Sequence, residues 1–302
     1  MDRIPSEYPH TDLAVERMGA DTELPGAEYS EEEGEGCRIA RLRIKDREAA
    51  ERLGRPEGTY ITMSFPPLFS IDESELSPLA VRLSSLIGEM CRGLPAVHSV
   101  LVVGLGNRYM TADAVGPESI RHIVATRHLR IEEPELFARY ADVEISLLSP
   151  GVMAQTGIEA QAIVSAAVTA LSPDLVIAVD ALAARSVTRL ATTVQLSDTG
   201  IRPGSGVGNA RRALDRESLG VPVLAIGIPS VVDTRTLVMD AFREAGLSDG
   251  EMPEALSRVL SEGESYFVSP RHADTLTERA AHLVADAVNM TFSSGLFEAA
   301  EG

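Results

Sequence analysis

Lysine is almost absent from this sequence. Lys45 is the single lysine in 302 residues, and it lies far from every glycine-rich segment. Phosphate-binding loops and pyridoxal Schiff bases both depend on a lysine side chain, so the sequence argues against both. Tryptophan is absent and aromatic residues make up 4% of the chain, so aliphatic side chains must fill the core.

Cysteine and long apolar runs are also lacking. Cys37 and Cys91 are too few for a disulfide framework or a zinc cage, and they suit a reducing compartment. The six histidines form no closely spaced pair of metal ligands. No apolar run approaches the roughly 20 residues of a membrane span, and the N-terminus has no apolar signal-peptide segment. These absences predict a cytoplasmic protein with no metal, no other cofactor and no membrane contact.

Basic residues are fewer than acidic residues in this sequence. The chain carries 45 acidic and 27 basic residues, which gives a net charge of −18. Such a surface repels phosphate backbones, so direct nucleic-acid binding is not expected. The same charge would suit a basic partner, or it serves solubility alone.

The N-terminal part of the chain differs in composition from the rest. Its first 36 residues are acidic and rich in glycine, proline and glutamate. Segments of this kind bury little apolar surface, so we expect residues 13–36 to be loosely ordered. Beyond them, residues 39–44 and 60–65 alternate apolar and polar side chains, which predicts a small antiparallel β arm.

From residue 100 onward, apolar strands alternate with helical segments. Strands are expected at 100–103, 143–148, 175–179 and 221–226. Near-continuous apolar strands separated by helices predict an α/β fold, a three-layer sandwich with a mostly parallel central sheet. Because no internal repeat or linker divides the chain, residues 13–302 are expected to form a single domain.

Two helices matter for this arrangement. One is expected over residues 113–128, directly after the first of these strands. The second should follow a capping box formed by Thr156 and Glu159 and run to Ala170.

Two of the predicted strands lead to an aspartate. The strand at 100–103 is followed by Gly104-Leu-Gly106-Asn107 and then by Asp113, and the strand at 175–179 runs into Asp180. Right-handed crossovers place the carboxyl ends of parallel strands at one edge of the sheet, where open α/β folds bind ligands. The sequence therefore predicts that Asp113 and Asp180 lie at the same edge.

The first glycine turn does not fit a dinucleotide-binding fingerprint. Tyr109 stands where the third glycine is required, and Arg127 and His128 occupy the region where an acid should bind the ribose. No nucleophile elbow of the Gly-x-Ser-x-Gly type is present either.

Other motifs leave alternatives open. The loop with Gly204, Gly206 and Gly208 lacks the lysine of a phosphate loop, so it is either a tight surface turn or a place where a substrate backbone can approach closely. The segment Asp198-Thr199-Gly200 is similar to one half of a pepsin-like active site, but it occurs once and in an α/β setting. A turn or a supporting role is the better interpretation.

The aspartate pair itself has two interpretations. Asp113 at a helix start could be a simple cap. Two neighbouring carboxylates, however, split their pKa values, so that one accepts a proton while the other donates one. This is the equipment for activating water against an amide, and the backbone amides of Gly104, Gly106 and Asn107 could then stabilise the oxyanion.

Over about residues 100–233 the sequence resembles the germination protease family, the spore endopeptidases of endospore-forming bacteria. Together the shared motifs are highly specific, and they lie at residues 102–107, 111–117, 126–129, 150–153, 156–159, 179–186, 197–201, 203–209, 220–223 and 226–233. The stretch after Asp233 is shorter than in better-known members, which bears on oligomer contacts and substrate reach.

The resemblance implies an atypical aspartic endopeptidase that starts the degradation of small acid-soluble spore proteins in the spore core at germination. It implies an α/β sandwich like that of hydrogenase-maturation peptidases, and assembly as a homotetramer. The family's two carboxylates map onto Asp113 and Asp180. An acidic enzyme is consistent with substrates that coat DNA.

The resemblance also implies a zymogen. Members of the family clip their own N-terminus where an acid precedes a bulky apolar residue, an alanine and a further acid. Residues 11–16, Thr-Asp-Leu-Ala-Val-Glu, fit this pattern. Residues 1–12 would then be a propeptide, with self-cleavage between Asp12 and Leu13.

Two rival interpretations remain. A hydrogenase-maturation-type peptidase shares the Gly-x-Gly-Asn layout but uses nickel, which no histidine cluster supports. A non-enzymatic α/β protein could use the two glycine loops to bind a small molecule.

Overall fold

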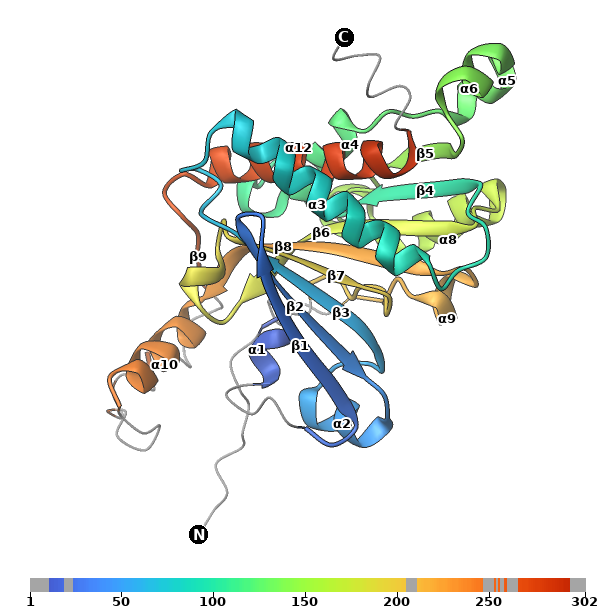
Figure 1. Ribbon diagram of the computed structural model, residues 1–302. Helices are drawn as coiled ribbons and strands as arrows, with labels where there is room; N and C mark the ends of the chain where they lie inside the picture. The colour runs from blue at the N-terminus through green and yellow to red at the C-terminus, as the bar shows by residue number, and fades with distance from the viewer. Residues whose placement is uncertain are drawn as a thin grey trace.

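The computed structural model describes residues 11–18, 24–204, 211–246 and 266–293, together with positions 253, 255, 258 and 259. Within them, nine strands form one sheet (Figure 1). In chain order these are β1 Ala27–Gly34, β2 Cys37–Ile44, β3 Gly58–Ser64, β4 Ser99–Gly104, β5 Glu144–Leu148, β6 Leu175–Ala184, β7 Thr193–Ser197, β8 Val223–Asp233 and β9 Phe267–Val268. Their order across the sheet is β1-β2-β3-β7-β8-β6-β4-β5, and β9 pairs with β8.

Helices connect and cover these strands. The described α-helices are α1 Val15–Met18, α2 Arg47–Leu53, α3 Glu73–Cys91, α4 Val115–His122, α5 Arg127–Glu132, α6 Pro134–Tyr140, α7 Met153–Thr156, α8 Ala160–Leu171, α9 Arg216–Leu219, α10 Thr234–Glu244 and α12 Ala273–Phe292. Two short 3₁₀ turns, η1 Thr111–Asp113 and η2 Val187–Arg189, complete the set.

The sheet has a parallel and an antiparallel part. Strands β5, β4, β6 and β8 run parallel. The expected antiparallel arm, β1 to β3, joins them through β7, so it extends the central sheet without a break. The α/β class expected from the sequence is confirmed.

Side chains of the central strands are buried on both faces. Val100 and Val102 of β4 pack under α3 and α12, whereas Leu101 and Val103 point to the opposite face and contact the buried side of α8. Burial on both faces explains why these strands are unbroken apolar runs.

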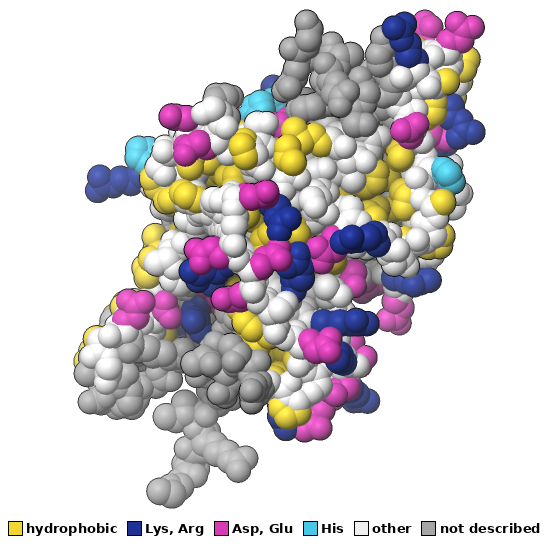
Figure 2. Space-filling model, viewed as in Figure 1, with side chains coloured by type: hydrophobic (Ala, Val, Ile, Leu, Met, Phe, Trp, Pro, Cys, Tyr) yellow, Lys and Arg dark blue, Asp and Glu magenta, His cyan; other side chains and the backbone are white. Residues whose placement is uncertain are grey.

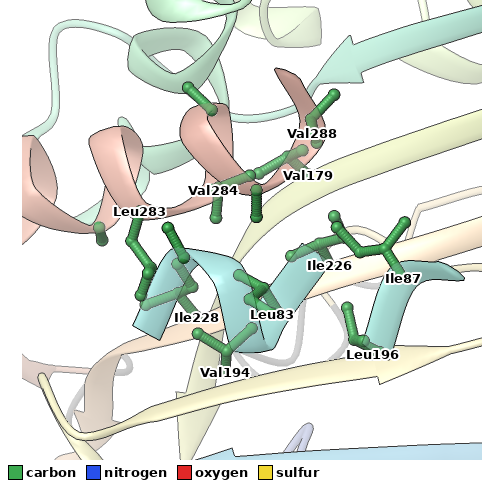
Figure 3. Close-up of a cluster of buried hydrophobic side chains, with 14 of the residues drawn as sticks. Leu83, Ile87, Val179, Val194, Leu196, Ile226, Ile228, Leu283, Val284 and Val288 are labelled. Atoms are coloured by element: carbon green, nitrogen blue, oxygen red, sulfur yellow. The ribbon is translucent and has the colours of Figure 1, made fainter. Parts of the chain in front are cut away.

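The largest cluster of buried apolar side chains among the described residues lies between the sheet and the helix pair α3 and α12 (Figure 3). Leu83 of α3 and Val284 of α12 converge there over Val179, Ile226 and Val194, which come from β6, β8 and β7. All five side chains are fully buried. This packing fixes the strands that carry the functional site.

The expectation that residues 13–36 are loosely ordered is wrong for the described residues among them. Leu13 and Ala14 are completely buried, and β1 pairs with β2 over its whole length, from Ala27 opposite Ile44 to Gly34 opposite Cys37. Strand β1 is mostly exposed and charged because it forms the edge of the sheet. Backbone pairing holds it in place, and its composition does not reveal that pairing.

The helix expected over 113–128 divides into two. Helix α4 ends at His122, and Ile123 is extended. The side chain of Asn289 accepts a hydrogen bond from Val124 N at 2.9 Å and donates one to His122 O at 3.0 Å. This partner on α12 satisfies the backbone groups that the helix end leaves open.

The capping box expected at Thr156 does not form. Thr156 is the last residue of α7, and Gly157 adopts a left-handed conformation that ends this helix. Helix α8 begins separately, with Glu159 as its N-cap. The Thr156 hydroxyl instead accepts a hydrogen bond from Ile158 N at 3.1 Å.

The surface mixes both signs of charge. On the face shown in Figure 2, acidic and basic side chains lie next to one another. Arg41, for example, pairs with Glu89 at 2.9 Å and with Glu32 at 3.2 Å. The acidic excess is therefore interspersed with arginines on this face.

Candidate active site

Asp180 lies inside β6, where the neighbouring strand has ended. We expected the strand to stop at residue 179, but it continues to Ala184. Strand β4 ends at Gly104, opposite Val179, and Leu105 N then donates to Val179 O at 2.8 Å. Asp180 is thus the first residue of β6 beyond the end of β4.

The environment of Asp180 favours its neutral form. The residue is 4% exposed, and its Oδ1 accepts a hydrogen bond from Ala181 N at 3.0 Å. Burial raises the pKa of Asp180 well above its usual value, and the nearby charges of Asp113 and Asp12 raise it further. A carboxyl group of this kind holds its proton to a higher pH than an exposed aspartate does.

Asp113 is positioned by the glycine turn. Asn107 N lies 2.8 Å from Asp113 Oδ2 and 3.1 Å from the Asp113 backbone oxygen. Gly106 has a φ of 113°, and a Cβ there would lie 2.1 Å from the Asp113 backbone oxygen. Only glycine fits this close approach. Burial raises the pKa of Asp113, while the hydrogen bond from Asn107 opposes that shift.

The two aspartates line the same cavity. It has a volume of about 320 Å³, and Asp12 lies in its wall with Asp113 and Asp180. We call it the acid cavity. Because burial and the charge of Asp113 both raise the pKa of Asp180, Asp180 can remain protonated while Asp113 is ionised. The arrangement can supply a general acid and a general base to one substrate.

Of the amides expected to stabilise an oxyanion, that of Asn107 has another partner, as does the amide of Leu105 in the same turn. Leu105 N bonds Val179 O, and Asn107 N bonds Asp113. Gly104 serves close packing, since a Cβ there would lie 2.3 Å from Gly116 O. Of the second glycine loop, Gly204 lines the acid cavity, while Gly206 and Gly208 lie outside the described residues.

The expected cleavage site Asp12–Leu13 lies at this cavity. Asp12 N donates to Ala183 O at 2.8 Å, and Ala183 N donates to Asp12 Oδ2 at 3.0 Å. Arg55 Nη2 lies 3.8 Å from Asp12 Oδ1. Leu13 is completely buried in an apolar cluster with Leu182, Ala184, Leu190 and Val232.

Sequence reasoning missed the contact of Gln195 with this segment, and it identified Glu16 only as the acid of the cleavage pattern. Gln195 of β7 bonds both Asp12 O and Ala14 N. Glu16 is 7% exposed and accepts hydrogen bonds from Arg185 N at 2.7 Å and Ser186 N at 3.0 Å. The one available signal was a glutamine inside an apolar strand pattern.

Asp198 has a structural contact. Its Oδ1 accepts a hydrogen bond from Thr59 N at 2.7 Å, which ties the end of β7 to the start of β3. Thr199 Oγ1 donates to Tyr60 Oη at 3.2 Å. These bonds join neighbouring strands, as a turn would.

Across the residues that the structure describes, no group of three or more His, Cys, Asp or Glu side chains could hold a metal ion. None of the helices in the described part of the chain combines the length and apolar character that a membrane crossing requires.

Comparison with known proteins identifies the family. The germination protease of Caldanaerobacter subterraneus subsp. tengcongensis is 38% identical over 310 residues, which cover 95% of each chain. That of Bacillus cytotoxicus is 40% identical over 249 residues, 77% of this chain and 65% of the relative. A [NiFe] hydrogenase maturation protease, HycI from Thermococcus kodakarensis, aligns over 68% of this chain and 99% of its own at 16% identity, with a TM-score of 0.35, too low to support an argument. The sequence profile of the germination protease family matches residues 10–244. The chain therefore belongs to the germination protease family.

Proposed function

We propose that this protease is an aspartic endopeptidase in which Asp113 and Asp180 form the catalytic pair. The observation that carries the proposal is that both carboxyl groups line one cavity together with Asp12, the residue before the expected cleavage site. Each of the two carboxyl groups has a raised pKa, caused mainly by burial.

Hydrolysis then follows the usual course for such a pair. The ionised carboxylate takes a proton from a water molecule while the oxygen of that water attacks the carbonyl carbon. The protonated carboxyl group gives its proton to the leaving amine. The C–N bond breaks, one product ends in a carboxylate, and the other begins with an amine.

Substitution of each aspartate by asparagine tests this assignment. Asp113→Asn and Asp180→Asn should each abolish proteolysis while leaving the circular dichroism spectrum unchanged. Asp198→Asn is the matched control, since that carboxylate bonds a backbone amide between two strands. Near-wild-type activity in either Asp113→Asn or Asp180→Asn would contradict the assignment of the catalytic pair.

The proposed substrates are small acid-soluble spore proteins, cleaved in the spore core at germination. Family membership supports this, and the net charge of −18 is compatible with substrates that coat DNA. Incubation of a purified spore protein with the enzyme, followed by mass spectrometry, tests the substrate. We also propose a homotetramer, which analytical ultracentrifugation tests directly.

The proposed zymogen matures by self-cleavage between Asp12 and Leu13. The support is the position of Asp12 at the acid cavity and the complete burial of Leu13 beside it. N-terminal sequencing of the matured protein should give Leu-Ala-Val-Glu. A different start, or no trimming, contradicts the site.

A further inference from the structure

We infer that Gln195 is a catalytic residue, whose side-chain amide polarises the carbonyl group of the bond that is cut. The inference rests on the proposed cleavage between Asp12 and Leu13, because it takes the Asp12 carbonyl as the reacting group. Nothing in the sequence motifs assigned a role to this glutamine.

Gln195 contacts the peptide on both sides of that bond. Its Nε2 donates to Asp12 O at 3.0 Å, and its Oε1 accepts a hydrogen bond from Ala14 N at 2.7 Å. A carbonyl oxygen can only accept and a backbone N–H can only donate, so these partners fix which way the amide group points. Gln195 is 8% exposed, so water competes weakly for these bonds.

The sheet register places Gln195 across from Asp180. Gln195 pairs with Gly227 of β8, and Gly227 pairs with Asp180 of β6. Neighbouring strands lie about 4.8 Å apart, so the two Cα atoms are separated by about 10 Å. Gly227 carries no side chain between them, and Leu182 fills the space above it, since a Cβ at Gly227 would lie 2.3 Å from Leu182 Cδ1.

Both side chains point to the same face of the sheet. Val194 and Leu196 of β7, and Val179 of β6, lie in the core under α3 and α12. Side chains alternate along a strand, so Gln195 and Asp180 point away from that core. Both side chains therefore lie on the face of the sheet where Asp12 bonds β6 and β7.

The chemistry requires a donor at this position. When the water oxygen bonds to the carbonyl carbon, the electron pair of the C=O bond moves onto the Asp12 oxygen, and the Gln195 N–H bond stabilises that charge. The pair returns as the C–N bond breaks, and the nitrogen leaves with the proton from the carboxyl group. Loss of one such donor lowers kcat by about 100- to 1,000-fold in well-studied proteases.

Two substitutions of Gln195 distinguish a role in holding the peptide from a role in polarising its carbonyl group. Gln195→Glu keeps an acceptor for Ala14 N but removes the donor to Asp12 O, whereas Gln195→Met removes both. Ser197→Ala is the matched control, since Ser197 lies on the same face of β7 and bonds Gly200 O. The full-length chain is used throughout.

The first measurement is the rate constant of self-cleavage, followed by mass spectrometry. We expect Gln195→Glu and Gln195→Met to cleave about 100- to 1,000-fold more slowly than the wild type. Ser197→Ala should cleave at the wild-type rate. The second measurement is hydrogen exchange of residues 11–18 in the uncut protein, with Asp180→Asn as the reference. Residues 11–18 should be protected from exchange in Gln195→Glu to the same extent as in Asp180→Asn.

The outcomes are distinct. If Gln195→Glu and Gln195→Met both cleave within threefold of the wild type, Gln195 is not catalytic. If Gln195→Glu is slow and has also lost protection of residues 11–18, it positions the segment without polarising the carbonyl, which also overturns the inference. If the wild type and Ser197→Ala both fail to cut themselves, the proposed self-cleavage is wrong, and the inference falls with it.

Discussion

The carboxylate of Glu16 is held by the backbone amides of Arg185 and Ser186, at 2.7 and 3.0 Å, just beyond the end of β6. Thr11 Oγ1 donates to the same carboxylate. These bonds cross from the N-terminal segment to the sheet and fix the segment along β6. Asp12 is thereby held at the acid cavity.

Removal of this anchor should release the segment. Glu16→Ala leaves two partly buried N–H groups without their acceptor, at a cost of about 1 kcal/mol each. We expect self-cleavage to slow by at least tenfold and hydrogen exchange of residues 11–18 to accelerate. Glu33→Ala, at an exposed position of β1, should change neither quantity. An unchanged exchange rate in Glu16→Ala would show that the anchor is dispensable.

The raised pKa of Asp180 predicts a pH-dependent stability difference. An unfolded aspartate ionises near pH 3.9, whereas burial keeps Asp180 neutral to higher pH in the folded chain. The folded state then binds more protons, so the stability contribution of Asp180 falls as pH rises through that window. Asp180→Asn removes this loss. The Tm of the variant minus the Tm of the wild type should therefore increase as the pH rises from 4 to 7.

Asp174 supplies a comparison of opposite sign. A hydrogen bond from His98 N lowers the pKa of Asp174, with Ser99 contributing. Its stabilising contribution is present above the unfolded pKa and is lost as pH falls. The Tm of Asp174→Asn minus the Tm of the wild type should therefore decrease as the pH rises. Parallel Tm curves for all three proteins would contradict both signs.

Gly106 should be intolerant of a side chain. Its positive φ costs a non-glycine residue about 1–3 kcal/mol, and the added Cβ would also collide with the Asp113 backbone oxygen. We expect Gly106→Ala to lose more than 100-fold in proteolytic activity because Asp113 is displaced. Gly54→Ala is the control, since Gly54 also has a positive φ but has nothing within 4 Å of a new Cβ. It should lose stability and keep activity.

Asn289 should contribute to stability and not to catalysis. It is 3% exposed and bridges the break between α4 and α5. Asn289→Ala leaves Val124 N and His122 O without that partner, and we expect the free energy of unfolding to fall by about 1–3 kcal/mol. Denaturant titration measures the change, and the exposed Thr275→Ala on α12 is the control. Equal stability of the two variants would contradict the bridge.

The central fold was predictable because it depends on local patterns. Apolar strands at 100–103 and 175–179 gave the parallel sheet, and strand direction alone placed Asp113 and Asp180 at one cavity. The boundaries were less predictable. Asp180 lies within β6, since pairing with β8 continues after β4 has ended.

The rest depends on contacts between distant parts of the chain. Strand β1 has no apolar pattern, and Gln195 contacts Asp12 across 183 positions of sequence. Asn289 bonds Val124, which lies 165 positions before it and just after the end of α4. Such partners leave no signal in local periodicity, so a single sequence does not reveal them.

The anchoring of Glu16 gives the proposed maturation a second stage. Cutting before Leu13 leaves the new amino terminus seated, because Ala14 still bonds Gln195 and Glu16 still bonds the amides beyond β6. A ligand on a short covalent tether has an effective concentration in the millimolar range. The proposed spore-protein substrate must therefore compete with the new amino terminus of the enzyme itself. Under this proposal the departure of that terminus, as well as hydrolysis, sets when the acid cavity becomes free.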